Sequence, residues 1–207
     1  TASNQSKTYD GTALNADATC TVTSGSLVSG HTATCSNTGS QTNAGSSTKT
    51  LSSVVIKNSG GTDVSSNYNI TKANGTLTVN KVAATLTCNN KTYTGVEQIA
   101  CSCTGGTVGG TYKATNYSAT AYTASCSPDG NHTAPANKSW TMSKKAATIT
   151  AKAQTINYGT AISKTTNDIT ASGLVSGHSV TAITLTQSTT DVTTNGKITA
   201  SAATIIA

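Results

Sequence analysis

The chain is a succession of short segments in which apolar and polar residues alternate, and this pattern limits its fold more than any other feature. A period of two places alternate side chains on opposite faces of a β-strand. No stretch shows the 3.6-residue apolar period of an amphipathic helix. The sequence therefore predicts an all-β protein. The clearest segments are TCTVT, TLTV, ATLTC, SWTMS, ATITA and SVTAITLT.

The composition favours β structure over disorder. Thr, which is abundant, is β-branched and suits a pleated surface with one solvated face. Disordered chains are usually rich in Pro and charge, whereas this one has 2 Pro and 10% charged residues. All 13 basic residues are Lys, and they are scattered apart from Lys144-Lys145. We expect these lysines to lie on the solvated surface and at sheet edges, and we expect no nucleic-acid partner.

Repeated sequences divide the chain into three parts. KTYDG at 7–11 returns as KTYTG at 91–95 and, more loosely, as TINYGTA at 155–161. VNKVAATLT at 79–87 returns as MSKKAATIT at 142–150, and LVSGH occurs at 27–31 and 174–178. Such self-similarity is typical of tandem modules. The repeats place module boundaries near Lys81 and Ala146, with almost no linker between modules.

The repeats resemble known bacterial modules. The stretches SKTYDGTAL, GSLVSGHTAT and NYNITKANGTLTVNK resemble the YDG and MBG families of bacterial immunoglobulin-like repeats. KTYTGVEQ through SWTMSKKA resembles a related repeat with extra cysteines, and ITAKAQTINYGTAI with SGLVSGHSVTAITLT resembles an MBG repeat. The resemblance implies three tandem immunoglobulin-like β-sandwich modules in an elongated rod, over residues 1–81, 82–146 and 147–207. It also implies a large secreted or wall-attached surface protein, in which such repeats are spacers without catalytic residues.

The outer modules look incomplete. The first begins almost at its KTYDG turn, without the AATLT-type strand that precedes this turn elsewhere. The third lacks a counterpart of NYNITKANGTLTV, which closes the first. We expect the third module to be unstable alone, either because it belongs to a longer array or because neighbouring copies complete one another by strand addition in a fibre.

Six cysteines indicate disulfides and an oxidising, extracellular setting. Cys20 and Cys35 lie on either side of the first LVSGH loop and are expected to bridge neighbouring strands. The other four are Cys88, Cys101, Cys103 and Cys126. A bridge from Cys101 to Cys103 would be badly strained. The favoured pairing is Cys88–Cys101 with Cys103–Cys126, and Cys88–Cys103 with Cys101–Cys126 stays open.

Individual side chains give further expectations. Gly30 and Gly177 should supply the backbone freedom of the two LVSGH loops, with His31 and His178 facing solvent. Trp140 and Met142 share parity on one strand and should both point into the core of the middle module. Three closely spaced tyrosines suggest either a sugar-stacking platform or aromatic cover at a core edge. They are Tyr112, Tyr117 and Tyr122.

Nothing in the chain predicts chemistry. There is no GxSxG elbow and no phosphate-binding loop, and the three histidines are too far apart in sequence to form a zinc motif. We expect no enzyme activity, no metal, no cofactor and no membrane insertion in this segment. The predicted function is a spacer or stalk of a bacterial cell-surface, adhesin-like protein, whose partners are neighbouring repeats. The alternatives are a filament subunit completed by strand exchange, with other copies as partners, and a middle module that binds a host or surface glycan or a protein.

Overall fold

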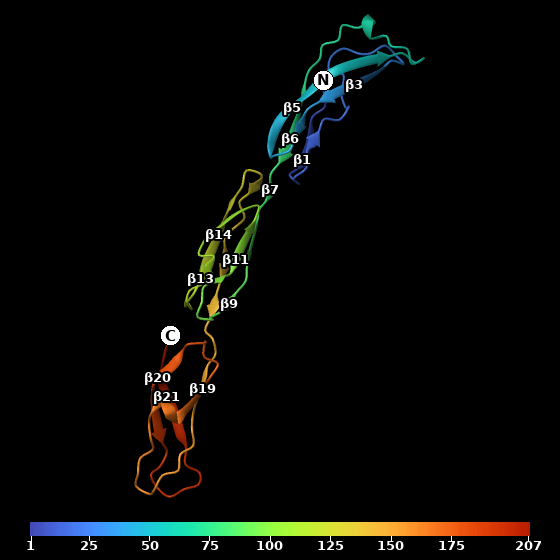
Figure 1. Ribbon diagram of the computed structural model, residues 1–207. Coiled ribbons are helices and arrows are strands. Elements are labelled where there is room, and N and C mark those ends of the chain that lie inside the picture. The colour runs from blue at the N-terminus through green and yellow to red at the C-terminus, as the bar shows by residue number, and fades with distance from the viewer. The chain divides into compact units, whose positions relative to one another are not determined.

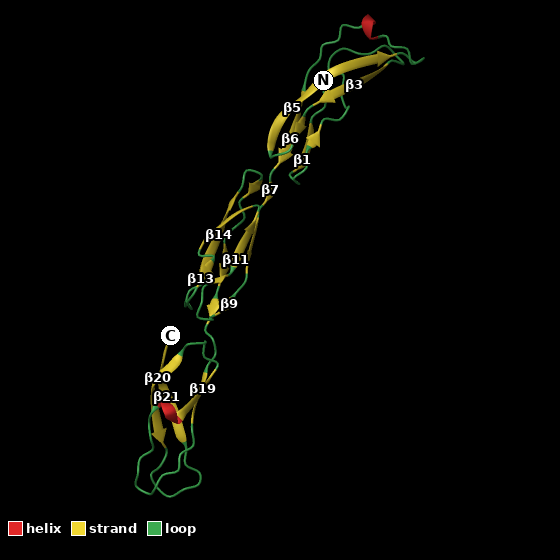
Figure 2. Ribbon diagram, viewed as in Figure 1, coloured by secondary structure: helices red, strands yellow, loops and turns green.

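The computed structural model describes residues 1–207 and is all-β apart from two short 3-10 helices (Figure 2). The residues form two compact units. The first comprises Thr1–Thr87, Ser102–Gly109 and Ser125–Asn137, and the second comprises Cys88–Cys101, Gly110–Ala124 and Lys138–Ala207. The division between the two units falls inside the predicted middle module, 82–146, so the two module boundaries, near Lys81 and Ala146, stay a prediction. No helix is both long and apolar enough to cross a membrane.

The first unit is built on a four-stranded sheet in the order β1-β6-β5-β3 (Figure 1). β5 pairs antiparallel with β3 on one side and with β6 on the other, whereas β6 pairs parallel with β1. The elements wholly within this unit are β1 (Gln5–Thr8), β2 (Leu14–Asn15), β3 (Thr32–Thr38), β4 (Ser40–Gln41), β5 (Gly45–Lys57), η1 (Ser65–Asn67), β6 (Gly75–Asn80), β7 (Val82–Ala83) and β15 (His132–Thr133).

Apolar and polar residues alternate along β6, which suits its place as an inner strand of the sheet. Leu77 and Val79 are 0% and 2% exposed, while Thr76 and Thr78, which alternate with them, are half-buried. Gly39, between β3 and β4, has a φ of +129° and lies close to the backbone of β5. A Cβ on Gly39 would lie 2.6 Å from the carbonyl oxygen of Thr48, so no other residue fits without moving the backbone.

The residues before β1 contact the rest of the first unit. Ala2 forms an antiparallel bridge with Cys20 and is buried against Cys35 and Leu51. The terminal ammonium of Thr1 donates to the carbonyl oxygen of Thr21 at 3.0 Å. This pairing is limited to one isolated bridge, so no AATLT-type strand precedes the turn.

Four strands contribute residues to both units: β8 (Thr85–Cys88), β11 (Cys101–Thr104), β12 (Gly106–Gly110) and β14 (Tyr122–Pro128). The second unit also contains β9 (Lys91–Thr92), β10 (Gln98–Ile99), β13 (Lys113–Ala114), β16 (Lys138–Trp140) and β17 (Met142–Ser143). β17 pairs parallel with β9, and Tyr122 in β14 lies opposite Trp140 in β16.

Trp140 and Met142 are each 1% exposed, which confirms that both point inward. The Trp140 indole Nε1 donates to the carbonyl oxygen of Thr111 at 2.7 Å, so its one polar atom is satisfied. The Tyr122 ring packs on the indole with a centroid separation of 4.7 Å.

The rest of the second unit consists of two antiparallel strand pairs around an apolar cluster. β18 (Thr148–Ala151) pairs with β19 (Ile169–Ser172), which follows η2 (Thr166–Asp168). β20 (Ser179–Gln187) pairs with β21 (Ile198–Ile206). Side chains of both pairs meet in one cluster, whose buried members are Ile162, Ile169 and Leu185. Each pair thus has one face on this core and one face in solvent.

Candidate functional site

The three disulfides are Cys20–Cys35, Cys88–Cys101 and Cys103–Cys126, and no cysteine is free. The structure confirms the favoured pairing of the four middle cysteines. Cys35, Cys101 and Cys126 are buried, so the bridges form part of the small apolar clusters. With this pairing no thiol is left for metal binding or catalysis.

The two LVSGH loops adopt the same turn. The amide of His31 donates to the carbonyl oxygen of Val28 at 3.0 Å, and the amide of His178 donates to that of Val175 at 3.0 Å. Gly30 and Gly177, with φ of +81° and +85°, supply the left-handed residue in each. The shared sequence thus encodes a shared backbone shape.

The prediction that His31 and His178 face solvent is wrong, because each is half-buried against a tyrosine. His31 Nδ1 shares a hydrogen bond of 2.7 Å with the hydroxyl of Tyr68. The His178 ring lies 5.9 Å from that of Tyr93. These tyrosines come from distant parts of the chain, so neighbouring sequence gave no sign of them.

The Tyr-x-Gly turns are contact points for histidines. In the first unit the ring of Tyr9, in KTYDG, meets His132 edge-on with centroids 5.6 Å apart. In the second unit Tyr93, in KTYTG, meets His178 in the LVSGH loop. Gly95 of the same turn lies so close to this loop that an added Cβ would be 2.7 Å from Val175 Cγ1. The repeated turn therefore packs each time against a histidine from the predicted following module.

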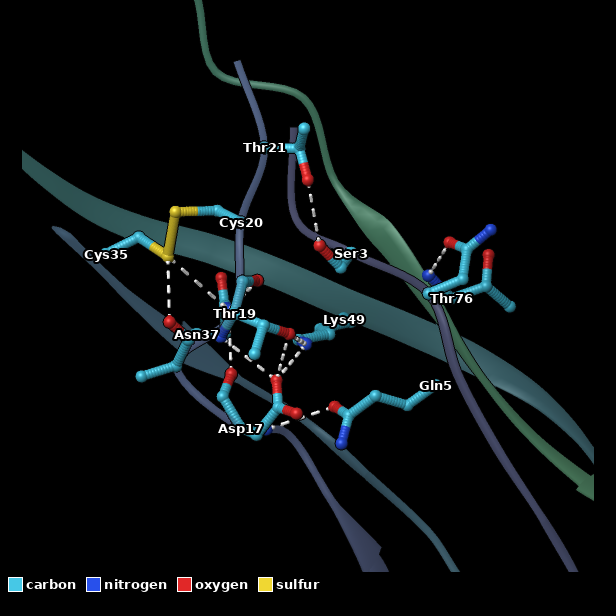
Figure 3. A network of polar contacts seen from close by, with 12 residues as sticks. Ser3, Gln5, Asp17, Thr19, Cys20, Thr21, Cys35, Asn37, Lys49 and Thr76 are labelled. Carbon is cyan, nitrogen blue, oxygen red and sulfur yellow. Dashed lines mark hydrogen bonds and ion pairs between the residues drawn. A yellow bond between two sulfur atoms is a disulfide. The ribbon is translucent and has the colours of Figure 1, made fainter. Parts of the chain in front are cut away.

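A buried lysine organises a polar network in the first unit (Figure 3). The side chain of Lys49 is fully enclosed, and its Nζ donates to Asp17 Oδ1 and to Thr19 Oγ1. Asn37 Nδ2 donates to the carbonyl oxygens of Asp17 and Thr19 at 2.7 and 2.9 Å. The expectation of surface lysines is wrong here. Because Lys49 is enclosed and already bonded to two acceptors, this network fixes the loop that leads to Cys20 and offers no access to a substrate.

The hydrogen bond from Lys49, followed by that from the Thr19 hydroxyl, lowers the pKa of Asp17 from 3.8 to about 2. Asp17 therefore contributes stability above pH 4, and this contribution is lost as the pH falls through 2. For Asp17→Asn we expect a lower urea midpoint of the first unit at pH 7 and a smaller difference from the unsubstituted protein at pH 2.5. Urea titrations at both pH values, followed by the amide signals of β3 and β5, measure this. The control is Asp191→Asn, at an exposed residue outside the network. A difference independent of pH would contradict the role given to the carboxylate.

The three candidate ligand-contact tyrosines do not form one platform. Tyr122 packs on Trp140 and donates its hydroxyl to the carbonyl oxygen of Asn116 at 2.7 Å. Tyr117 is 45% exposed, with the Lys144 ammonium 4.8 Å from its ring centroid. Tyr112 is half-buried. Tyr122 therefore covers the edge of the core. A sugar-stacking role stays a prediction, and of the three tyrosines only Tyr117 is exposed enough to stack on a sugar.

The first unit also contains a cavity of about 550 Å³ beside its LVSGH loop, lined by Cys20–Leu27, Leu51, Ile56 and Tyr68 among others. The only titratable side chain in its lining is Tyr68, whose hydroxyl is bonded to His31 and to the amide of Val28. No group of three His, Cys, Asp or Glu side chains is placed to hold a metal ion. This cavity brings together no acid, base and nucleophile.

Comparison with known proteins found no match among family models, curated proteins or solved structures.

Proposed function

We propose that the chain is a structural spacer of a secreted or cell-surface bacterial protein, built from immunoglobulin-like β-sandwich modules that resemble YDG and MBG repeats. It acts by holding its neighbours at a set separation and performs no catalysis. In a longer adhesin-like protein such a segment displays a distal part away from the cell. Its partners are the adjoining repeats of the same chain.

The observation that carries this proposal is the packing of a Tyr-x-Gly turn against a histidine in both units. Tyr9 meets His132 and Tyr93 meets His178, and the amide of Ala44 donates to Asn131 Oδ1 at 2.8 Å beside the first contact. These contacts join parts that the repeats assign to successive modules. A junction made by direct packing is stiffer than a flexible Gly/Ser linker. Stiffness at the junctions is the property that a spacer needs.

Three disulfides support an oxidising, extracellular setting. Small β domains with few aromatic residues have small cores, and covalent bridges compensate for this. The glycan-binding alternative gains no support from the separated tyrosines.

Within the second unit, the spacer proposal predicts that residues 147–207 tumble as one body with 88–101, 110–124 and 138–146, and that Gly95→Ala uncouples these two parts. The added methyl would meet Val175, and it would sit on a backbone with a φ of +86°. Nuclear magnetic relaxation of backbone amides measures the rotational correlation time of each part. We expect equal correlation times in the unsubstituted protein and different ones in Gly95→Ala.

Gly159→Ala is the matched control, because Gly159 has a φ of +76° but no atom within 4 Å of the added Cβ. It imposes similar backbone strain without touching a neighbour, and should leave the correlation times equal. Independent tumbling in the unsubstituted protein would refute the spacer proposal.

A further inference from the structure

β21 has one edge without a partner. It pairs antiparallel with β20 and with no other strand. In the first unit the corresponding strand is β5, because β3 follows the first LVSGH loop and β20 follows the second. β5 is paired on both edges, with β3 and with β6. The edge of β21 that corresponds to the β6 side of β5 is therefore open.

A second open edge is the extended segment Ala153–Asn157. It precedes the turn at Gly159 in the way that β1 precedes the KTYDG turn. None of its backbone amides donates to another group. The side chain of Gln154 holds it in place, with Oε1 accepting from the amide of Ser163 at 2.8 Å and Nε2 donating to the carbonyl oxygen of Ser163 at 2.9 Å. β1 pairs with β6 over its whole length, whereas this segment has no strand partner.

A groove of about 700 Å³ lies between this segment and the loop that leads into β21, and β21 itself contributes only its first residue, Ile198. One wall is formed by residues 151–158 and the other by residues 187–198. Ala151, Ile162 and Ile198 line the groove and also belong to the apolar cluster of this unit, so the groove opens onto the core. At its rim Ile156 is 38% exposed and Val192 is 87% exposed. Unpaired backbone and exposed apolar side chains at one place are features of a strand-binding site.

The first unit shows what fits such a groove. There β6 lies between β1 and β5, parallel to one and antiparallel to the other. Its inward residues Leu77 and Val79 are almost completely buried. A ligand for the groove thus needs an extended backbone and apolar residues at alternate positions.

We propose that the groove between Ala153–Tyr158 and Ser188–Ile198 binds one β-strand from a further repeat of the same kind. The strand carries apolar residues at alternate positions, as Gly75–Asn80 does, and runs parallel to Ala153–Asn157 and antiparallel to β21. The proposal rests on the proposed function for the source of the strand. A second copy of this chain is not that source, since its own β6 is the central strand of a sheet and leaves only if that sheet unfolds.

The test uses the full chain and two fluorescent peptides. The first has the sequence of Ala73–Lys81. In the second, Leu77 exchanges places with Thr76 and Val79 with Thr78, so composition is kept and the apolar side chains face the other way. Fluorescence anisotropy should show binding of the first peptide, and binding of the second at least about a hundredfold weaker, because two apolar side chains would no longer be buried.

Receptor variants locate the binding site. Ile156→Asp places a charge at the groove rim and should weaken binding of the first peptide at least about tenfold. The matched control, Ile99→Asp, changes a 65% exposed isoleucine outside the groove and should leave binding unchanged. Circular dichroism of both variants checks that they remain folded.

Three outcomes would overturn the proposal. The first is that neither peptide binds, and the second is that both bind equally, which indicates an unspecific apolar surface. The third is that the protein alone forms oligomers that Ile156→Asp dissolves, which makes a second copy the occupant. The spacer proposal is tested by whether the correlation times of two parts of the second unit are equal, which none of these outcomes decides, so the two proposals can fail separately.

Discussion

Trp140→Ala should unfold or badly loosen the part of the second unit that contains β16 and the start of β14. Truncating a buried aromatic residue costs about 3–5 kcal/mol, and a small domain has a free energy of unfolding of only about 5–15 kcal/mol. The chain has one Trp and no Phe, so no second large side chain takes its place. Thermal melts followed by the amide signals of Tyr122–Ala124 and Lys138–Trp140 measure the effect.

Two controls make the Trp140 result specific. The first sheet should keep its amide protection, because Trp140 does not belong to its unit. Trp140→Phe keeps an aromatic ring but loses the hydrogen bond to Thr111, so it should cost less than Trp140→Ala. If the melt of Trp140→Ala is unchanged, the indole is not a core residue and a ligand-binding role for this region gains weight.

Alkylation of the denatured protein without reductant should modify no cysteine, and after reduction it should modify all six. Reduction should lower stability most in residues 82–146, which contain two of the three bridges. These bridges close loops with sequence separations of 13 and 23. In the chain-entropy model, closing a loop of this size contributes about 3 kcal/mol. Mass spectrometry counts the adducts, and urea titrations with and without reductant compare the regions.

The paired variant Cys20→Ser with Cys35→Ser is the internal control. It removes the bridge of the first sheet, so it should destabilise β3 and β5 and leave Lys138–Trp140 unaffected. Alkylation of two or more cysteines before reduction would contradict the fully oxidised state.

Local pattern was enough to predict most of the strands and the largest core residue, although the predicted strand TCTVT forms only an isolated bridge at Cys20. The alternation in TLTV placed Leu77 and Val79 on one face, and the shared parity of Trp140 and Met142 placed both inside. The short spacing of Cys101 and Cys103 excluded a bridge between them and left two pairings, of which the structure has the favoured one. These features depend on residues close together in the sequence.

The contacts that the sequence did not reveal join distant segments. Lys49 is enclosed because Asp17 and Thr19 come from a loop that folds over β5, and a single lysine in a Thr-rich strand gives no sign of this. His31 and His178 are covered by Tyr68 and Tyr93, whose places depend on the tertiary fold. The groove also depends on two segments, Ala153–Asn157 and the start of β21, that only the folded chain brings together.

The parallel pairing of β1 with β6 bears on how the first sheet responds to tension. Tension along the chain acts on the sheet through β1 at one end and through β6 at the other. Because these two strands are parallel, it pulls them in opposite directions along their own axes, which is a shear load. All the residue pairs from Gln5–Leu77 to Thr8–Asn80 then resist at the same moment. In an antiparallel hairpin that is pulled apart at its open end, the hydrogen-bonded residue pairs would instead break one after another. Forced unfolding is governed by the unfolding rate, and here the slow step is the sliding of one strand along another.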